Sequence, residues 1–139
     1  MTVGSLTYHL KKNGITVKAN HTYRFQVPFS DIDMMGHVNN AKHFTYFETA
    51  RTDHLLSRFG KVLENKFEAA IVARAEIDYR APAMWNDELA VKLRVSSVGN
   101  TSWIYDYEVV NEKENRLIAE GKTVQVAYDY ERSSKIPIP

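Results

Sequence analysis

The sequence contains no cysteine, which excludes disulfides, thiolate metal sites and a cysteine nucleophile. Its charges nearly cancel, with 18 basic against 17 acidic side chains, so no overall field is available to hold a polyanion such as duplex DNA. No apolar stretch approaches the roughly 18 residues of a membrane span, and the N-terminal residues lack a signal-peptide core. We therefore expect a cytoplasmic chain without a membrane span, whose main partner is not nucleic acid.

The chain is long enough for one domain only. Its 139 residues, 44% apolar and 25% charged, have the size and composition of a single compact unit. Residues 1–20 show no sustained periodicity, which predicts an N-terminal arm or a short extra strand. Residues 21–139 are predicted to form the single main domain.

Alternation of apolar and polar residues predicts several strands. The first covers residues 23–29, where Pro28 removes an N–H and weakens the ladder. The later alternating segments are residues 71–79, 89–95, 103–109 and 118–128, the last with its apolar residues on even positions. Turns at residues 99–100 and 111–115 are short, so the last three strands are predicted to be antiparallel neighbours.

One long helix is predicted between the first and second strands. The stretch from about Asn39 to Phe59 contains neither glycine nor proline, is long enough for about five turns, and is followed by Gly60. At 100° per residue, one face carries Asn40, Phe44, Phe47, Glu48, Arg51 and Leu55. The order of elements predicts an α+β domain with one helix against an antiparallel sheet. Such a two-layer unit leaves faces uncovered, which favours a homodimer.

An acidic turn, DIDMMGHVNN, leads from the first strand into this helix. A helix start presents unpaired N–H groups and a positive dipole end, which can stabilise an oxyanion. A carboxylate from Asp31 or Asp33 beside that position can act as a nucleophile or a general base. On spacing alone, a second interpretation stays open, in which these aspartates only cap the turn and the helix.

The run from Phe29 to Arg51, FSDIDMMGHVNNAKHFTYFETAR, resembles the 4-hydroxybenzoyl-CoA thioesterase family of hotdog proteins. Members carry a similar D-x-D-x-x-G turn, often followed by H-V-N-N and a helix with Y-F-E-x-A-R. The resemblance covers about residues 21–130. It implies a hotdog fold, in which an antiparallel sheet of about five strands wraps a central helix, and a homodimer often paired into a homotetramer, with active sites between subunits. It implies hydrolysis of an acyl-CoA or acyl carrier protein thioester without a cofactor or metal.

The resemblance also assigns roles to residues of the turn. The family's catalytic carboxylate corresponds to Asp33, and its polarising main-chain N–H corresponds to Asn40. The residues expected to support the active-site turn are Asp31, Gly36, His37 and Asn39. Several relatives have histidine where this chain has Asn40, so a role that needs a titrating side chain there cannot be carried over.

Glu48 is the rival carboxylate. Related hotdog enzymes of other branches use a helix glutamate for catalysis, but Glu48 and Arg51 are also spaced to form a structural ion pair. A non-catalytic acyl-CoA-binding hotdog protein is the alternative function. A hydratase on the same fold is disfavoured because no suitable His–Asp pair lies on the predicted helix.

Two further sets of residues are candidates for substrate contacts. Cations of the type that binds the phosphates of CoA are Arg74, Arg80, Arg132 and Lys135. Apolar side chains that could line the acyl pocket are Phe44, Phe47, Phe59, Phe67, Met84 and Trp85.

Overall fold

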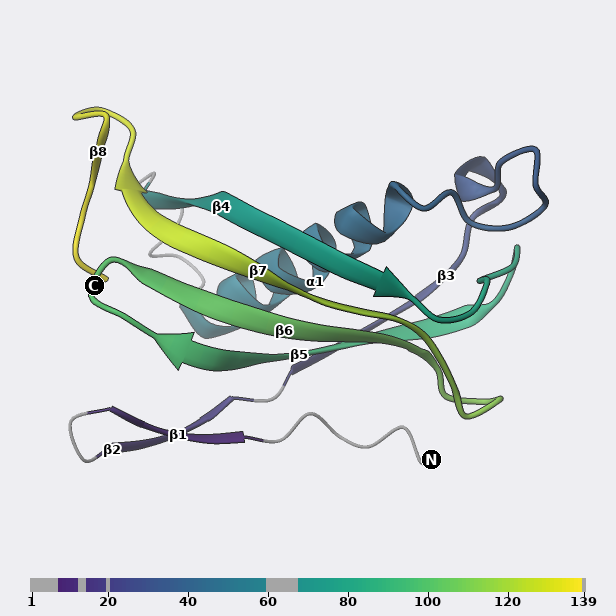
Figure 1. Ribbon diagram of the computed structural model, residues 1–139, viewed down its shortest axis with the longest axis horizontal. Coiled ribbons are helices and arrows are strands. Elements are labelled where there is room, and N and C mark those ends of the chain that lie inside the picture. Colours follow the sequence, from purple (N-terminus) through teal and green to yellow (C-terminus); the bar gives the residue numbers. More distant parts are fainter. Residues whose placement is uncertain (1–7, 13–14, 20, 60–67, 139) are drawn as a thin grey trace.

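The computed structural model describes residues 8–12, 15–19, 21–59 and 68–138 (Figure 1). Its elements are, in chain order, β1 (Tyr8–Lys12), β2 (Ile15–Ala19), β3 (His21–Gln26), the short 3-10 helix η1 (Phe29–Asp31), α1 (Lys42–Phe59), β4 (Glu68–Tyr79), β5 (Glu88–Val98), β6 (Ser102–Asn111), β7 (Arg116–Asp129) and β8 (Ser134–Lys135). Gly60, the predicted end of the helix, lies outside the described residues. No helix in the described ranges is long and apolar enough to cross a membrane.

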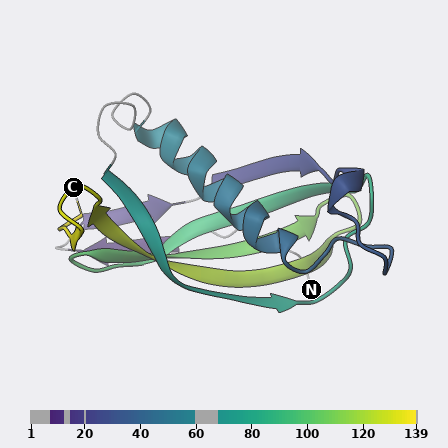
Figure 2. The same ribbon diagram turned by 90° about the horizontal axis from the view of Figure 1, so that it is seen from above.

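The main sheet is antiparallel and has the order β3-β5-β6-β7-β4, with β8 paired to β7. The helix α1 crosses one face of this sheet (Figure 2). The predicted α+β architecture, with one long helix against an antiparallel sheet, is therefore confirmed. Within residues 1–20, β1 and β2 pair with each other and lie next to β5, so this segment holds two strands where an arm or one short extra strand was predicted.

Phe47 of α1 marks the centre of the contact between helix and sheet. Its ring is fully buried and stacks on Tyr107 of β6, with centroids 4.2 Å apart and planes 8° apart. Tyr107 pairs with Gly121 of β7, where a Cβ atom would overlap the Glu76 main-chain oxygen and lie 2.9 Å from Phe47 Cε2. Glycine is needed at this position because the backbone of β4 and the Phe47 ring occupy the space of a side chain.

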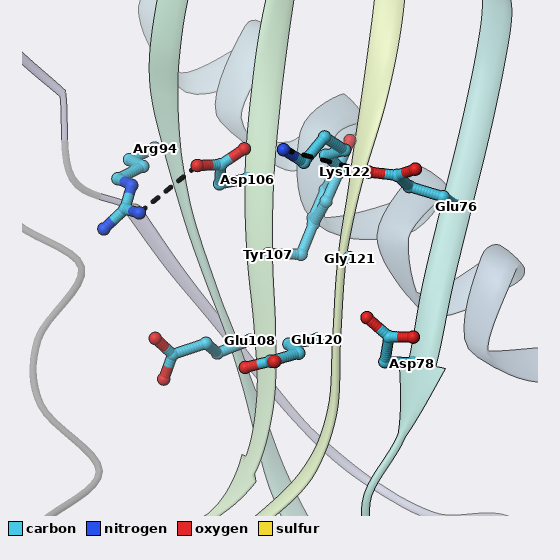
Figure 3. A pocket seen from close by; sticks show the side chains of 9 residues that line it. All are labelled: Glu76, Asp78, Arg94, Asp106, Tyr107, Glu108, Glu120, Gly121 and Lys122. Carbon is cyan, nitrogen blue, oxygen red and sulfur yellow. Dashed lines mark hydrogen bonds and ion pairs between the residues drawn. The ribbon is translucent and has the colours of Figure 1, made fainter.

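The inner face of β7 matches the prediction only in part: the even-numbered Ile118 is fully buried in the core, but the middle of the strand turns odd-numbered residues inward. Gly121 faces Phe47, and the odd-numbered Thr123 and Gln125 are buried. Even-numbered Glu120 and Lys122 line the opposite, outer face (Figure 3). For residues 121–125 the prediction was wrong because the inner face there uses glycine and hydrogen-bonded polar side chains, whereas apolarity alone favoured the even positions.

The buried stripe of α1 also differs from the predicted face. Glu48 was placed on that face, but its side chain is 67% exposed, and Phe44 is 38% exposed. The buried side chains are His43, Tyr46, Phe47, Ala50 and His54. His54 is tolerated there because its Nδ1 atom is hydrogen-bonded to the Tyr105 hydroxyl at 2.8 Å.

Candidate active site

The turn between η1 and α1 is closed by main-chain hydrogen bonds across its two arms. The Asn39 N–H donates to the Asp31 carbonyl at 3.0 Å, and the Asp33 N–H donates to the His37 carbonyl at 3.1 Å. Gly36, at the tip, has a φ of +86° and donates its N–H to the Asp33 carbonyl at 3.0 Å. This left-handed conformation costs glycine little and other residues more, so Gly36 supports the turn through its backbone.

The two aspartates of the turn have different partners. The Asp31 carboxylate accepts the Tyr46 hydroxyl at 2.7 Å and lies 3.8 Å from Lys42 Nζ, and its side chain is only 12% exposed. The Asp33 carboxylate accepts one N–H, from Met35, at its Oδ1 atom. Its Oδ2 atom has no hydrogen-bond partner among the described residues. Asp33 is thus the aspartate that keeps an oxygen available to a substrate.

At the start of α1, Asn39 satisfies two of the N–H groups. Its side-chain oxygen accepts the Ala41 N–H at 2.9 Å, and its carbonyl accepts the Lys42 N–H at 2.9 Å. The His43 N–H donates to the Asn40 carbonyl at 3.3 Å. The Asn40 N–H donates to no group of the described residues. The Asn40 N–H is therefore an open donor at the start of α1, as far as the described residues go. Helix formation begins at Lys42, later than predicted, because Asn39 and Asn40 serve as the cap.

Three aromatic rings stand beside the turn. His43 packs edge-on against Tyr46 and Tyr79, with centroids 5.5 Å and 5.4 Å apart. The Tyr46 hydroxyl binds Asp31, and the Tyr79 hydroxyl donates to the Asn40 carbonyl at 2.7 Å. From sequence, Tyr79 was predicted only as the end of the strand over residues 71–79. No local signal predicts that the end of β4 lies beside the start of α1.

Burial controls the protonation of these rings. It lowers the pKa of His43 to about 4, so the imidazole is neutral near pH 7. The Nδ1 atom of His43 is buried and has no hydrogen-bond partner among the described residues. Burial and the hydrogen bond to Asp31 raise the pKa of Tyr46, so its hydroxyl stays protonated and donates.

Lowering the pH from 7 to 4 is expected to destabilise the wild-type chain more than a His43→Phe chain. The unfolded chain protonates His43 near pH 6.5, whereas the folded chain does so only near pH 4. The stability that neutral His43 confers is complete above pH 6.5 and is lost as the pH falls toward 4, by about 2–3 kcal/mol. Urea unfolding of both chains at both pH values measures this difference, because titrating groups common to the two chains cancel. Parallel pH dependences would contradict a buried, neutral His43.

The rival carboxylate lies outside the turn. Glu48 Oε2 is 3.8 Å from Arg51 Nη2, and the Arg51 side chain is 15% exposed against 67% for Glu48. The ion pair predicted from the spacing is therefore present. Glu48 was expected to be buried, but it projects into solvent because it points away from the buried stripe of α1. An exposed pair of this kind contributes little to stability.

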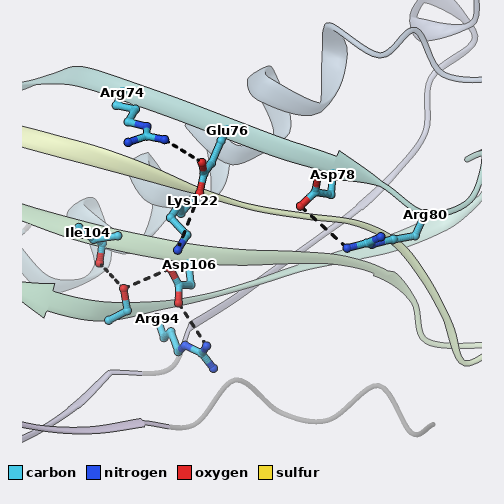
Figure 4. A network of polar contacts seen from close by, with 9 residues as sticks. Arg74, Glu76, Asp78, Arg80, Arg94, Ile104, Asp106 and Lys122 are labelled. Carbon is cyan, nitrogen blue, oxygen red and sulfur yellow. Dashed lines mark hydrogen bonds and ion pairs between the residues drawn. The ribbon is translucent and has the colours of Figure 1, made fainter.

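The candidate cations for CoA phosphates do not gather at one place. Arg74 pairs with Glu76, and Arg80 lies 3.9 Å from Asp78 (Figure 4). Arg80 also pairs with Glu120, at 2.8 Å. Near the C-terminal end, Arg132 pairs with Asp129, and Lys135 is exposed on β8.

The candidate acyl-pocket residues are similarly divided. Phe47 is buried in the core, whereas Met84 and Trp85 are 43% and 59% exposed. Trp85 forms an edge-to-face contact with Phe29, with centroids 5.7 Å apart. Phe44 is 38% exposed. The side chains of Phe59 and Phe67 lie outside the described residues.

A charged depression occupies the outer face of the sheet, away from α1 (Figure 3). It is lined by Glu76, Asp78, Arg94, Asp106, Tyr107, Glu108, Glu120, Gly121 and Lys122. None of residues 31–40 contributes to it. Burial and the neighbouring Glu120 raise the pKa of Glu108 there. Its excess of carboxylates makes it a poor site for the phosphates of CoA.

The chain matches the model of the thioesterase-like superfamily over residues 27–139. It is 30% identical over 108 residues to the acyl-CoA thioester hydrolase YbgC of Escherichia coli O6:H1, covering 75% of this chain and 78% of YbgC. It is 34% identical over 84 residues to YsmA of Bacillus subtilis strain 168, covering 60% of this chain and 56% of YsmA. It is similar to the crystal structure of a 1,4-dihydroxy-2-naphthoyl-CoA thioesterase from Synechocystis, with a TM-score of 0.77, 26% identity, and coverage of 86% of this chain and 90% of that one.

The TM-score of 0.77 agrees with the observed antiparallel sheet and long helix. The family match includes the whole of the turn, α1 and the strands β4 to β7. The hotdog fold and the thioester hydrolase class predicted from the sequence are confirmed. The chain belongs to the thioesterase-like superfamily.

Proposed function

We propose that this protein hydrolyses acyl-CoA thioesters, with the Asp33 carboxylate as nucleophile or general base and the Asn40 main-chain N–H as oxyanion donor. The observation that carries this proposal is that one turn holds two groups without a hydrogen-bond partner among the described residues: an oxygen of Asp33 and the N–H of Asn40. The relative YbgC, whose similarity covers three quarters of this chain, is named as an acyl-CoA thioester hydrolase.

The chemistry needs a polarised carbonyl and an oxygen nucleophile. The thioester oxygen accepts the Asn40 N–H at the positive end of α1, which stabilises the negative charge that develops there. In the nucleophilic route, an Asp33 oxygen attacks the acyl carbon, the C–S bond breaks, and water then hydrolyses the mixed anhydride. In the general-base route, Asp33 accepts a proton from water while that water attacks. The thiolate leaves readily in both routes.

The remaining residues of the turn have supporting roles in this proposal. Asp31 ties the turn to Tyr46, and Asn39 caps α1 so that the next N–H, that of Asn40, stays open. His37 contributes its carbonyl to the closure of the turn. Glu48 acts structurally, because it lies on the exposed side of the helix and forms an ion pair with Arg51.

Self-association is part of the proposal. Strand β4 is an edge of the main sheet, and most of its described side chains are exposed, including Val72 and Tyr79 at 40% and 41%. A long edge strand with unpaired backbone groups is a natural place for pairing with a second copy. Joining two sheets along β4 would give the homodimer, and two such dimers the homotetramer, that the family resemblance implies.

A hydrolysis screen tests the activity directly. Purified protein is incubated with a series of aryl-CoA and alkanoyl-CoA thioesters, and the released thiol is measured with a chromogenic reagent. Turnover of at least one class, with a kcat in the ordinary enzyme range of about 1–1000 per second, is expected. The same acyl group on acyl carrier protein, assayed in parallel, distinguishes the two carriers.

Binding without thiol release would contradict the proposal. Calorimetric titration with the same thioesters detects binding independently of chemistry. If acyl-CoA binds but no chain length yields thiol, the chain is a non-catalytic acyl-CoA-binding protein of the same fold.

A further inference from the structure

Hydrogen bonds hold the peptide groups on both sides of the Asn40 Cα atom. The Asn40 N–H belongs to the same planar peptide group as the Asn39 carbonyl, which accepts the Lys42 N–H at 2.9 Å. The following peptide group carries the Asn40 carbonyl, which accepts the Tyr79 hydroxyl at 2.7 Å. With both peptide groups held, the φ and ψ angles of Asn40 have little freedom to change, and the direction of its N–H is defined.

Tyr79 makes this contact from a distant part of the chain. It is the last residue of β4, and its hydroxyl reaches a main-chain group 39 positions earlier. Partial burial raises the pKa of Tyr79, so the hydroxyl stays protonated and can donate at neutral pH. The edge strand of the sheet is thereby tied to the start of α1.

The His43 ring packs against the ring of Tyr79. It is 3% exposed and meets the Tyr79 ring edge-on, at 5.4 Å between centroids and 69° between planes. Its other contact is Tyr46, at 5.5 Å and 73°. Since His43 is buried between two tyrosines, it limits the positions that the Tyr79 ring can adopt.

We propose that Tyr79 is a positioning residue for thioester hydrolysis, whose hydroxyl, supported by the His43 ring, holds Asn40 so that its N–H points toward the developing oxyanion. This inference rests on the proposed function and adds a residue of β4 to the site. Without the Tyr79 hydroxyl, the Asn40 carbonyl keeps only the longer bond from the His43 N–H, at 3.3 Å. Stabilisation of the transition state should fall while binding of the thioester is retained.

The test compares two variants that each lose one phenolic hydroxyl. Tyr79→Phe is expected to lower kcat about tenfold with little change in KM, less than the loss seen when an oxyanion donor itself is removed. Tyr128→Phe, on β7 beside β8, is the matched control and is expected to keep the wild-type kcat. His43→Ala should lower kcat as Tyr79→Phe does, and His43→Phe, which keeps a ring, should restore most of it.

A second measurement separates positioning from a general loss of stability. Amide hydrogen exchange at Ala41 and His43 should become faster in Tyr79→Phe, while the exchange of β6 amides is unchanged. An active wild type with a Tyr79→Phe variant of equal kcat overturns this inference alone. A raised KM at unchanged kcat also overturns it, because Tyr79 would then be a substrate contact. A wild type that releases no thiol overturns the proposed function and this inference with it.

Discussion

Replacing Asp33 with asparagine is expected to lower kcat for acyl-CoA hydrolysis by about a thousandfold or more, which corresponds to at least about 4 kcal/mol of transition-state stabilisation. An amide is neither a useful nucleophile for the acyl carbon nor a base for water. The fold should survive, because the asparagine Oδ1 can still accept the Met35 N–H that Asp33 accepts at 2.9 Å. Steady-state kinetics with thiol detection, beside urea unfolding of the same preparation, measures both effects.

Asp33→Ala and Glu48→Gln complete this experiment. Asp33→Ala also removes the turn acceptor and should cost about 1 kcal/mol of stability in addition to the loss of activity. Glu48→Gln changes an exposed carboxylate paired with Arg51 and should leave kcat near the wild-type value. Near-wild-type hydrolysis by Asp33→Ala would reject Asp33 as the catalytic group, and a large loss in Glu48→Gln would move the assignment to the helix.

Replacing Phe47 with alanine is expected to lower the free energy of unfolding by about 3–5 kcal/mol. The side chain is fully buried, stacks on Tyr107 at 4.2 Å, and fills the space above Gly121. The cavity cannot close easily, because both neighbours belong to the central strands of the sheet. This loss is a large fraction of the stability of a typical domain, about 5–15 kcal/mol. Urea unfolding at a fixed protein concentration measures it, since self-association would otherwise shift the midpoint.

Phe44→Ala is the matched control for the core prediction. Phe44 lies on the same helix and its ring meets the Phe47 ring edge-on, with centroids 6.3 Å apart, but it is 38% exposed. Replacing Phe44 should lower the free energy of unfolding by about 1–2 kcal/mol, because its side chain buries less apolar surface than that of Phe47. Equal losses for the two phenylalanines would contradict the assignment of Phe47 as the centre of the helix–sheet contact.

The fold was largely predictable because its determinants are local. Alternating residues in 71–79 and 89–95 and the uninterrupted stretch before Phe59 gave the correct order of strands and helix. Errors arose where burial depends on partners. The inner face of β7 uses Gly121 and hydrogen-bonded Thr123, which no apolar periodicity indicates.

The same division applies to the helix. The predicted face included Glu48, whereas the buried stripe includes His43 and His54. Histidine counts as a polar residue in a sequence pattern, but its ring can be buried when suitable partners are present. His43 packs against Tyr79, and His54 is hydrogen-bonded to Tyr105. Those partners come from other strands, so their presence follows from the packing of the sheet against the helix.

By itself, the sequence determined the turn that carries Asp33 and the helix start that exposes Asn40, because both depend on residues within ten positions of each other. Only the tertiary structure decided how these groups are held. Tyr46 engages Asp31, and Tyr79 reaches the Asn40 carbonyl from the end of β4. The physical reason is that a hydrogen bond between residues 39 positions apart depends on the order of strands in the sheet and on the packing of α1 across it, which no short sequence pattern encodes.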